Sequence, residues 1–221
     1  GDVYKRQTED AALLMEVISG GDKYDSTCSD KAVPKYSQKL NNNKSYTIGY
    51  IKETLESSAL DAQVKSHILE KIEQLKVSGH KVIAIDFPYL QYLVPTYYVL
   101  TTAEASSNLA RYDGVHFGYR CADAKGIPST YASSRTKGFG EEVQRRIMLG
   151  TFVLSAGYYD AYYTKAQKVR RLLLDKTHTI FEKCDFILSP TSPHTAFEIG
   201  KTYDDPTKLY LEDIFTVHAN I

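Results

Sequence analysis

Residues Tyr46–Ile51 read YTIGYI and residues Lys81–Phe87 read KVIAIDF, and an amphipathic segment over Ser58–Ser78 lies between them. The two outer segments are short apolar runs rich in β-branched and aromatic residues, which predicts buried strands. In the middle segment apolar residues recur every three or four positions up to Gly79, which predicts a helix. A strand, a helix and a strand within about 40 residues make a βαβ unit, so we predict a parallel strand pair with a right-handed crossover.

The remainder of the chain extends this unit into an α/β fold. A mostly helical segment is predicted over Tyr89–Arg111, and an irregular one over Tyr112–Gly138. A long helical stretch is predicted from about Glu141 to Lys176, with Gly157 as a possible interruption. Residues Phe186–Leu188 predict a third short strand.

Composition limits the classes of function. The chain has 221 residues, with 27 basic and 27 acidic side chains. This balance gives no electrostatic reason to wrap nucleic acid directly. No apolar run reaches the roughly 18 residues of a membrane span, and no signal-peptide core is present. The three cysteines are widely spaced and odd in number, which favours reduced thiols in a cytoplasmic protein.

The two ends of the sequence differ from the rest. The opening residues 1–7, GDVYKRQ, are interpreted as a non-native artefact, so the domain is taken as residues 8–221. Thr8–Ile18 predicts a helix with Thr8 as its cap. Asp205–Pro206 predicts the start of a last helix that runs to about Thr216. Because no capping signal follows, both ends are interpreted as truncations of a larger domain.

Two blocks carry an unusual mixture of residues. Thr102–Tyr119 reads TAEASSNLARYDGVHFGY, and Gly138–Tyr163 reads GFGEEVQRRIMLGTFVLSAGYYDAYY. Small, aromatic and charged residues alternate in both. A core helix would be more uniformly apolar and a solvated helix more uniformly charged. We therefore predict helices that pack closely on their neighbours and also line a polar site.

Arg146 is the first candidate for that site. On the predicted helix, Val143, Ile147 and Leu154 share a buried stripe, Arg146 lies at its border, and Arg145 points further toward solvent. A border arginine can bury its stem and present its guanidinium to a bidentate carboxylate. Spacing alone leaves open the alternative that Arg146 pairs with an acid of the same chain.

Two further candidates are Asp213 and Tyr97. Asp213 is placed four residues after Leu209 on the predicted last helix, where it could meet an ammonium group or remain a surface carboxylate. Tyr97 follows Pro95 in an apolar segment, and it could pack in the core with its hydroxyl bonded inside or lie against a ligand.

Other motifs are weak. Ser134 and Lys137 match the spacing of hydrolases with a lysine base, but without the partner motifs. The histidines show no metal-ligand spacing, so no metal site is predicted. The residues alone indicate a cytoplasmic α/β chain with a polar pocket and no identifiable catalytic group.

Long stretches of the chain resemble the amidase signature family, and within it the glutamine-hydrolysing subunits of tRNA-dependent amidotransferases. The resemblance covers nearly all of the sequence after Gln7, and His116 departs from the arginine that is usual there. The stretches that carry it are Thr8–Ile18, Pro95–Gly118, Gly138–Arg170 and Asp185–Thr216.

The resemblance implies a mixed β-sheet flanked by helices, here incomplete. It also implies a Ser–Ser–Lys triad with an oxyanion hole. The family's triad residues precede the part that matches from Thr8, so no catalytic residue is expected in this chain. By the same resemblance, Arg146 would hold the α-carboxylate of glutamine, Asp213 its α-ammonium, and Tyr97 would lie against the substrate.

In the enzyme that the resemblance implies, ammonia from glutamine passes to the B subunit, which activates glutamyl-tRNA with ATP and magnesium, and the pair is clamped by the small C subunit. This chain would need no cofactor, and tRNA would be contacted mainly by the B subunit. Two alternatives are an amidase-signature hydrolase of another amide, and a non-catalytic binding or assembly module.

Overall fold

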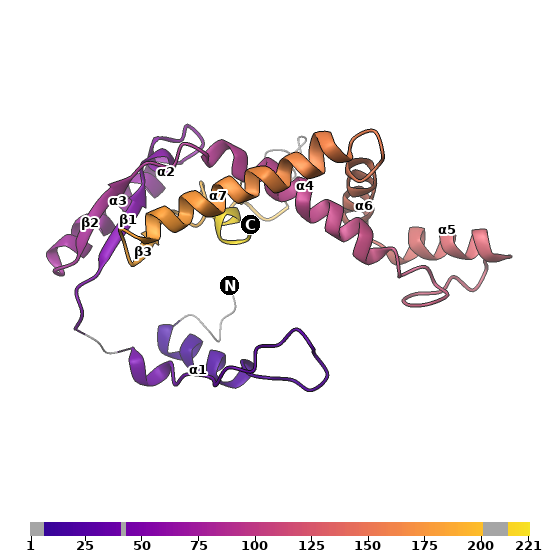
Figure 1. The fold of residues 1–221 in the computed structure, drawn as a ribbon, viewed down its shortest axis with the longest axis horizontal. Coiled ribbons are helices and arrows are strands. Elements are labelled where there is room, and N and C mark those ends of the chain that lie inside the picture. The colour runs from indigo at the N-terminus through magenta and orange to yellow at the C-terminus, as the bar shows by residue number, and fades with distance from the viewer. Residues whose placement is uncertain (1–6, 41–42, 201–211) are drawn as a thin grey trace. The chain divides into compact units, whose positions relative to one another are not determined.

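A computed structural model describes residues 7–40, 43–200 and 212–221 (Figure 1). The chain divides into two compact units, residues 1–45 and 46–221. Residues 1–6 of the predicted artefact segment lie outside the described part of the chain.

The first unit is built on helix α1, Thr8–Ile18, as predicted. The cap is not Thr8, because Gln7 takes the extended conformation that precedes the helix and Thr8 is its first residue. The carboxylate of Glu16 accepts hydrogen bonds from the backbone N–H and the hydroxyl of Ser37, at 2.8 and 2.7 Å. These bonds attach α1 to the short helix η2, Ser37–Lys39.

The second unit contains a parallel sheet. Strands β1 (Thr47–Ile51), β2 (Lys81–Ile85) and β3 (Phe186–Leu188) have the order β2-β1-β3. Both pairs are parallel, and Gly49 is in register with Ile83 and Ile187. The predicted parallel pair and the third strand are therefore confirmed.

The main helix between β1 and β2 starts four residues later than the predicted Ser58. After the short helix α2, Lys52–Glu56, the main helix α3 spans Ala62–Val77. Its start is fixed by Asp61, whose carboxylate accepts hydrogen bonds from the N–H groups of Gln63 and Val64 at 2.7 and 3.4 Å. An aspartate at this position satisfies donors that the first turn would otherwise leave unpaired.

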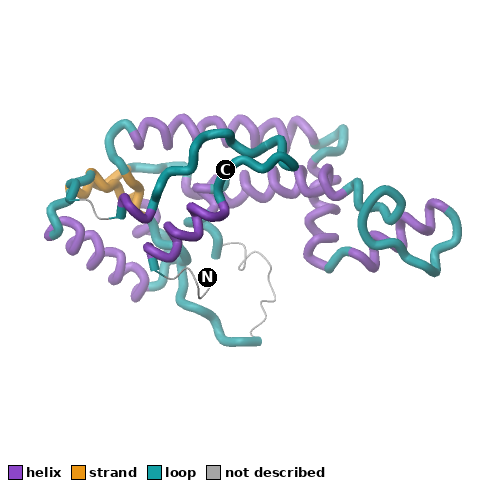
Figure 2. The backbone as a smooth tube through the Cα atoms, turned by 90° about the horizontal axis from the view of Figure 1, so that it is seen from below, coloured by secondary structure: helices purple, strands orange, loops and turns teal. Residues whose placement is uncertain are grey.

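Two long helices, α4 (Leu90–Leu109) and α7 (Lys165–Phe181), run side by side next to the sheet (Figure 2). Pro95 lies inside α4 and does not start it. One core cluster joins the sheet, both helices and the end of the chain. Its buried members are Ile51, Phe87, Leu93, Leu173, Ile180, Cys184 and Val217.

The predicted long helical stretch is broken into three parts. Helix α6 spans Glu141–Val153, a π-helix labelled η3 spans Tyr159–Thr164, and α7 follows. Gly157 lies in the turn between α6 and η3, so the predicted interruption is confirmed. A π-helix is rare, and each of its hydrogen bonds spans one residue more than in an α-helix.

The irregular segment predicted over 112–138 is wrong in its second half, which forms helix α5, Ile127–Gly138. A proline in its first turn is compatible with helix initiation, a signal that the serine- and threonine-rich composition obscured. The helix is anchored by Arg135, whose Nη1 donates to the carbonyl oxygens of Leu109 and Tyr112 at 2.7 and 3.2 Å.

The last helix predicted from Asp205–Pro206 falls mostly outside the described residues. Residues 212–216 form turns, followed by the short helix η4, Val217–Ala219. Asp213 therefore lies in a turn and not on a helix. Within the described part of the chain, no helix has the length and apolar character needed to cross a membrane.

Candidate functional site: a polar pocket beside helices α4 and α6

Helices α4 and α6 cross at a glycine. A β-carbon at Gly150 would collide with the backbone carbonyl of Thr102 and crowd the side chain of Ser106. Next to this contact, the hydroxyls of Ser106 and Thr151 form a hydrogen bond of 2.9 Å. Such an approach is possible only without a side chain at this position. The predicted close packing of the two mixed blocks is therefore confirmed.

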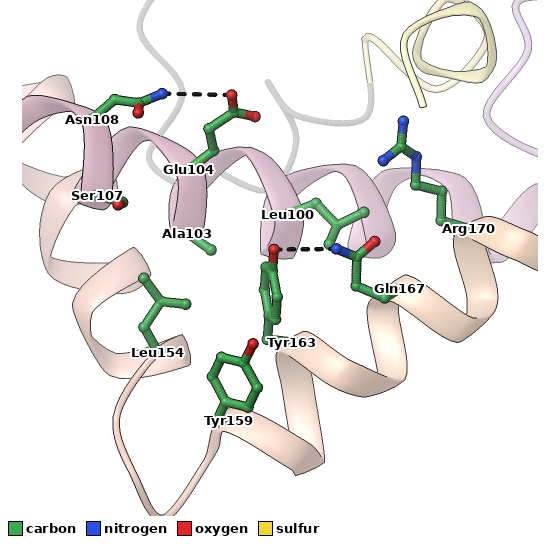
Figure 3. Close-up of a pocket in the computed structure, with 10 residues that line it drawn as sticks. All are labelled: Leu100, Ala103, Glu104, Ser107, Asn108, Leu154, Tyr159, Tyr163, Gln167 and Arg170. Carbon is green, nitrogen blue, oxygen red and sulfur yellow. Dashed lines mark hydrogen bonds between the residues drawn. The ribbon is translucent and has the colours of Figure 1, made fainter.

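A pocket of about 290 Å³ opens beside this crossing (Figure 3). One wall comes from α4, and the opposite wall from η3 and the first turns of α7. The two mixed blocks supply seven of the ten lining residues, so both blocks line a polar pocket. The lining residues are Leu100, Ala103, Glu104, Ser107, Asn108, Leu154, Tyr159, Tyr163, Gln167 and Arg170.

The polar groups of this pocket are partly engaged with one another. The amide of Asn108 donates to Glu104 at 3.5 Å, and the amide of Gln167 donates to the Tyr163 hydroxyl at 3.1 Å (Figure 3). Arg170 donates through Nε to the carbonyl oxygen of Ile221 at 2.8 Å. The described lining includes no histidine, cysteine or lysine to activate a nucleophile. The chemistry present is that of binding a polar molecule.

Arg146 projects from α6 toward α4. Its Nε lies 3.0 Å from Oε1 of Glu142, one turn earlier, and its guanidinium lies 5.5 Å from the centre of the Tyr98 ring. The side chain is 35% exposed, compared with 49% for Arg145, which agrees with the predicted border position. The structure thus gives Arg146 an acidic partner in the same chain, the alternative that spacing had left open.

Tyr97 lies on α4, directly before Tyr98. It is half-buried and packs against the core cluster that includes Val217. Its ring meets the ring of Tyr98 edge to face, with centroids 5.2 Å apart and planes at 86°. Tyr97 and Arg146 are therefore joined through one aromatic ring.

The carboxylate of Asp213 is exposed, while its backbone carbonyl accepts hydrogen bonds from the N–H groups of Thr216 and Val217, both at 3.0 Å. The neighbouring side chain, Glu212, accepts from the Ser192 hydroxyl at 3.1 Å and lies 2.9 Å from Nδ1 of His194. Sequence reasoning missed this anchor of the Asp213 turn.

The structure brings the three candidates together only in part. Tyr98 joins Tyr97 to Arg146, and the core cluster joins Tyr97 to the turn that begins at Asp213. None of the three lines the pocket of Figure 3. The zwitterion clamp that the resemblance implies for Arg146 and Asp213 stays a prediction.

Ser134 has a structural role. It is buried, and its hydroxyl accepts a hydrogen bond from the backbone N–H of Cys121 at 3.0 Å. Lys137 lies 3.4 Å from a carboxylate oxygen of Asp123. These contacts give both residues of the weak hydrolase motif a part in holding α5 and the loop before it.

The surroundings of Asp113 and His218 shift the pKa of each side chain. Hydrogen bonds from His116, first from its side chain at 2.7 Å and then from its backbone, lower the pKa of Asp113 well below its usual range. His116, the position at which the sequence departs from the resemblance, thus pairs with an acid of the same loop. Burial lowers the pKa of His218, whose Nε2 lies 2.8 Å from the Thr177 hydroxyl.

Among the described residues, no group of three or more histidine, cysteine, aspartate or glutamate side chains is placed to hold a metal ion.

The fold and the site together define an α/β chain with a small parallel sheet and a polar pocket lined by helices. The chain belongs to the amidase family, since the family model described as Amidase matches residues 3–221. That match begins within the segment interpreted as an artefact.

Proteins from several bacteria are similar over nearly the whole chain. The A subunit of glutamyl-tRNA(Gln) amidotransferase from Koribacter versatilis is 47% identical over 219 residues, 99% of this chain and 45% of the relative. The protein of the same name from Sulfurihydrogenibium sp. is 48% identical over the same shares. The chain thus spans about 45% of the length of the curated relatives that it matches.

Solved structures agree. A crystal structure of the A subunit of glutamyl-tRNA(Gln) amidotransferase from Thermotoga maritima is 39% identical, with a TM-score of 0.71 over 97% of this chain and 42% of that one. A bacterial aryl acylamidase of the amidase signature family, 17% identical with a TM-score of 0.62, shows the fold alone. The predicted α/β fold of the amidase signature family, in incomplete form, is therefore confirmed.

Proposed function

We propose that this chain is the substrate-recognition part of the glutamine-hydrolysing subunit of a tRNA-dependent amidotransferase. The observation that carries the proposal is the identity of 46–48% over nearly the whole chain to relatives named as the A subunit of glutamyl-tRNA(Gln) amidotransferase. In this function, glutamine is hydrolysed to glutamate and ammonia, and the ammonia converts glutamyl-tRNA(Gln) to glutaminyl-tRNA(Gln).

The part that this chain contributes is recognition of the amino-acid head group. A zwitterion needs one cation and one anion, placed so that the side-chain amide reaches a nucleophile. We assign the carboxylate to Arg146, the ammonium to Asp213, and contact with the substrate to Tyr97. The half-exposed guanidinium of Arg146 lies beside the ring of Tyr98, which follows Tyr97 on α4. This arrangement supports the first and third assignments. The exposed carboxylate of Asp213 is available to a ligand.

The catalytic Ser–Ser–Lys triad is assigned to the part of the family length that this chain does not span. The B and C subunits of the amidotransferase are the proposed partners in the cytoplasm, with tRNA, ATP and magnesium bound mainly by the B subunit. We propose no cofactor for this chain. An amidase acting on an apolar amide would have no use for a charged clamp, so the pair Arg146 and Asp213 separates the two hypotheses.

The experiment is a comparison of two adjacent arginines in the complete subunit that carries this sequence, purified with its partners. Arg146→Ala should raise the KM for glutamine by about 30-fold or more, because truncating a charged hydrogen-bonding partner costs roughly 2–5 kcal/mol. Arg145→Ala is the matched control, since Arg145 extends from the same turn toward Glu141 and Glu142. Equal KM values for wild type and Arg146→Ala would reject the proposed clamp.

A further inference from the structure

The guanidinium of Arg146 is held from two directions. Glu142 lies one turn earlier on α6 and binds Nε at 3.0 Å. The Tyr98 ring of α4 lies 5.5 Å from the guanidinium carbon, within the range of a cation–π contact. One contact fixes the rotation of the side chain within its own helix, and the other fixes it against the neighbouring helix.

This arrangement suits a residue that must present a carboxylate-binding edge. Arginine has a long, flexible stem, and its planar fork recognises a carboxylate best through two parallel N–H groups. A carboxylate bound at Nε lies along one side of the guanidinium plane. The edge formed by the two terminal nitrogens, Nη1 and Nη2, is a different side. The Glu142 bond is therefore compatible with end-on binding of a second carboxylate.

Stability alone gives a poor account of the pair. Both partners are partly exposed, at 35% for Arg146 and 44% for Glu142, and exposed ion pairs one turn apart contribute little to folding. Glu142 also pairs with Arg145 through its other oxygen, Oε2 to Nη1, at 2.6 Å. The Glu142 carboxylate thus contacts both arginines, and the guanidinium of Arg146 in addition lies over the Tyr98 ring.

We propose that Glu142 and Tyr98 are positioning residues, which orient the Arg146 guanidinium for the α-carboxylate of the substrate. The inference rests on the proposed function, because it assigns that carboxylate to Arg146. Tyr98 has a second aromatic contact, since the ring of Tyr97 meets it edge to face. Glutamate, arginine and the two tyrosines then form one connected unit across α4 and α6.

The test is steady-state glutamine hydrolysis by the complete subunit with its partners. Glu142→Ala should raise the KM for glutamine about tenfold with kcat little changed, because misorientation of a binding group weakens capture of the substrate. Glu142→Gln keeps an acceptor oxygen for Nε and should lie between wild type and the alanine variant. Glu141→Ala is the control, since it removes an acid from the same first turn that pairs only with Arg145 among the described contacts.

Two further measurements separate positioning from general damage. 4-Aminobutanamide lacks the α-carboxylate, so its hydrolysis should be equal in Glu142→Ala and wild type. In the double variant Glu142→Ala/Arg146→Ala, the KM for glutamine should match that of Arg146→Ala alone. Multiplying effects, or equal losses with both substrates, would overturn the positioning role.

The aromatic contact has its own pair of variants. Tyr98→Phe keeps the ring face and should retain the wild-type KM, whereas Tyr98→Leu should raise it by about threefold to tenfold through loss of the cation–π contact. Equal KM values for the phenylalanine and leucine variants would remove Tyr98 from the proposal. If Arg146→Ala has the wild-type KM, the proposed function fails. If Arg146→Ala raises the KM but the Glu142 variants keep the wild-type KM, the positioning role fails and the proposed function stands.

Discussion

The backbone carbonyl oxygen of Thr102 occupies the space that a β-carbon at position 150 would need. This contact sets the separation of α4 and α6, the two helices that carry Tyr97, Tyr98 and Arg146. A backbone atom cannot turn away as a side chain can, so relief of a clash requires movement of a whole helix.

Gly150→Ala is therefore expected to be destabilising. Overpacking of a closely packed contact costs about 1–3 kcal/mol, which outweighs the roughly 1 kcal/mol by which alanine favours a helix over glycine. Urea unfolding followed by circular dichroism gives the change in free energy. Gly157→Ala is the control, because no atom lies within 4 Å of the added β-carbon. A Gly150→Ala protein as stable as wild type would show that the helices can separate without cost.

The order of the main elements was predictable because it depends on local patterns. The parallel pair β1 and β2 followed from two apolar runs around an amphipathic helix, and the stripe Val64, Ile68 and Ile72 packs as its spacing indicates. Helix α5 was missed because serine and threonine obscured its initiating proline and because its anchor is not local. Arg135 binds carbonyl groups at the end of α4, and the sequence around it contains no apolar periodicity to reveal this.

In the candidate site, too, local features were predictable and contacts between distant segments were not. The border position of Arg146 followed from helical geometry, and its half-exposed side chain confirms it. Its partner Glu142 is four residues away and could have been found as an i,i+4 ion pair. The contact with Tyr98 and the bonds from Ser192 and His194 to Glu212 could not, because they join segments far apart in the sequence. The roles of Arg146 and Asp213 toward glutamine come from resemblance and stay predictions.

Glu212 is expected to hold the turn that carries Asp213. Its carboxylate is 20% exposed and bonds to Ser192 and His194, so Glu212→Ala should lower the free energy of unfolding by about 1 kcal/mol. The exposed residue Glu198 offers the comparison, and Glu198→Ala should change stability by less than about 0.5 kcal/mol. Indistinguishable urea midpoints for the two variants would show that this anchor contributes nothing.

Protonation of His218 should lower the free energy of unfolding as the pH falls below neutral. Burial lowers the pKa of its folded-state imidazole below the ordinary value of about 6.5. As the pH falls through about 6.5, the unfolded chain binds this proton first, so the free energy of unfolding decreases until the folded-state pKa is passed. Above the unfolded pKa both states are neutral, and His218 contributes no pH dependence there.

The variant His218→Gln isolates this effect from the other histidines. Glutamine offers Thr177 a hydrogen-bonding partner without a proton to bind in this range. Urea unfolding from about one pH unit above to one unit below 6.5 should show a shallower decline for the variant than for wild type. Parallel curves would mean that His218 titrates alike in the folded and unfolded states.

Substrate analogues should assign the two charges of the clamp separately. Asp213→Asn keeps the shape of the side chain and removes its charge, so the KM for glutamine should rise by about tenfold or more through loss of a charged contact with the ammonium group. For 4-carbamoylbutanoate, which lacks the α-amino group, wild type and Asp213→Asn should have the same KM. Arg146→Ala should instead lose its effect on 4-aminobutanamide, which lacks the carboxylate. Steady-state ammonia release by the complete subunit gives the KM of each protein for each substrate. If Asp213→Asn raises the KM for glutamine and for 4-carbamoylbutanoate equally, the Asp213 carboxylate supports the fold of its turn and does not bind the ammonium group.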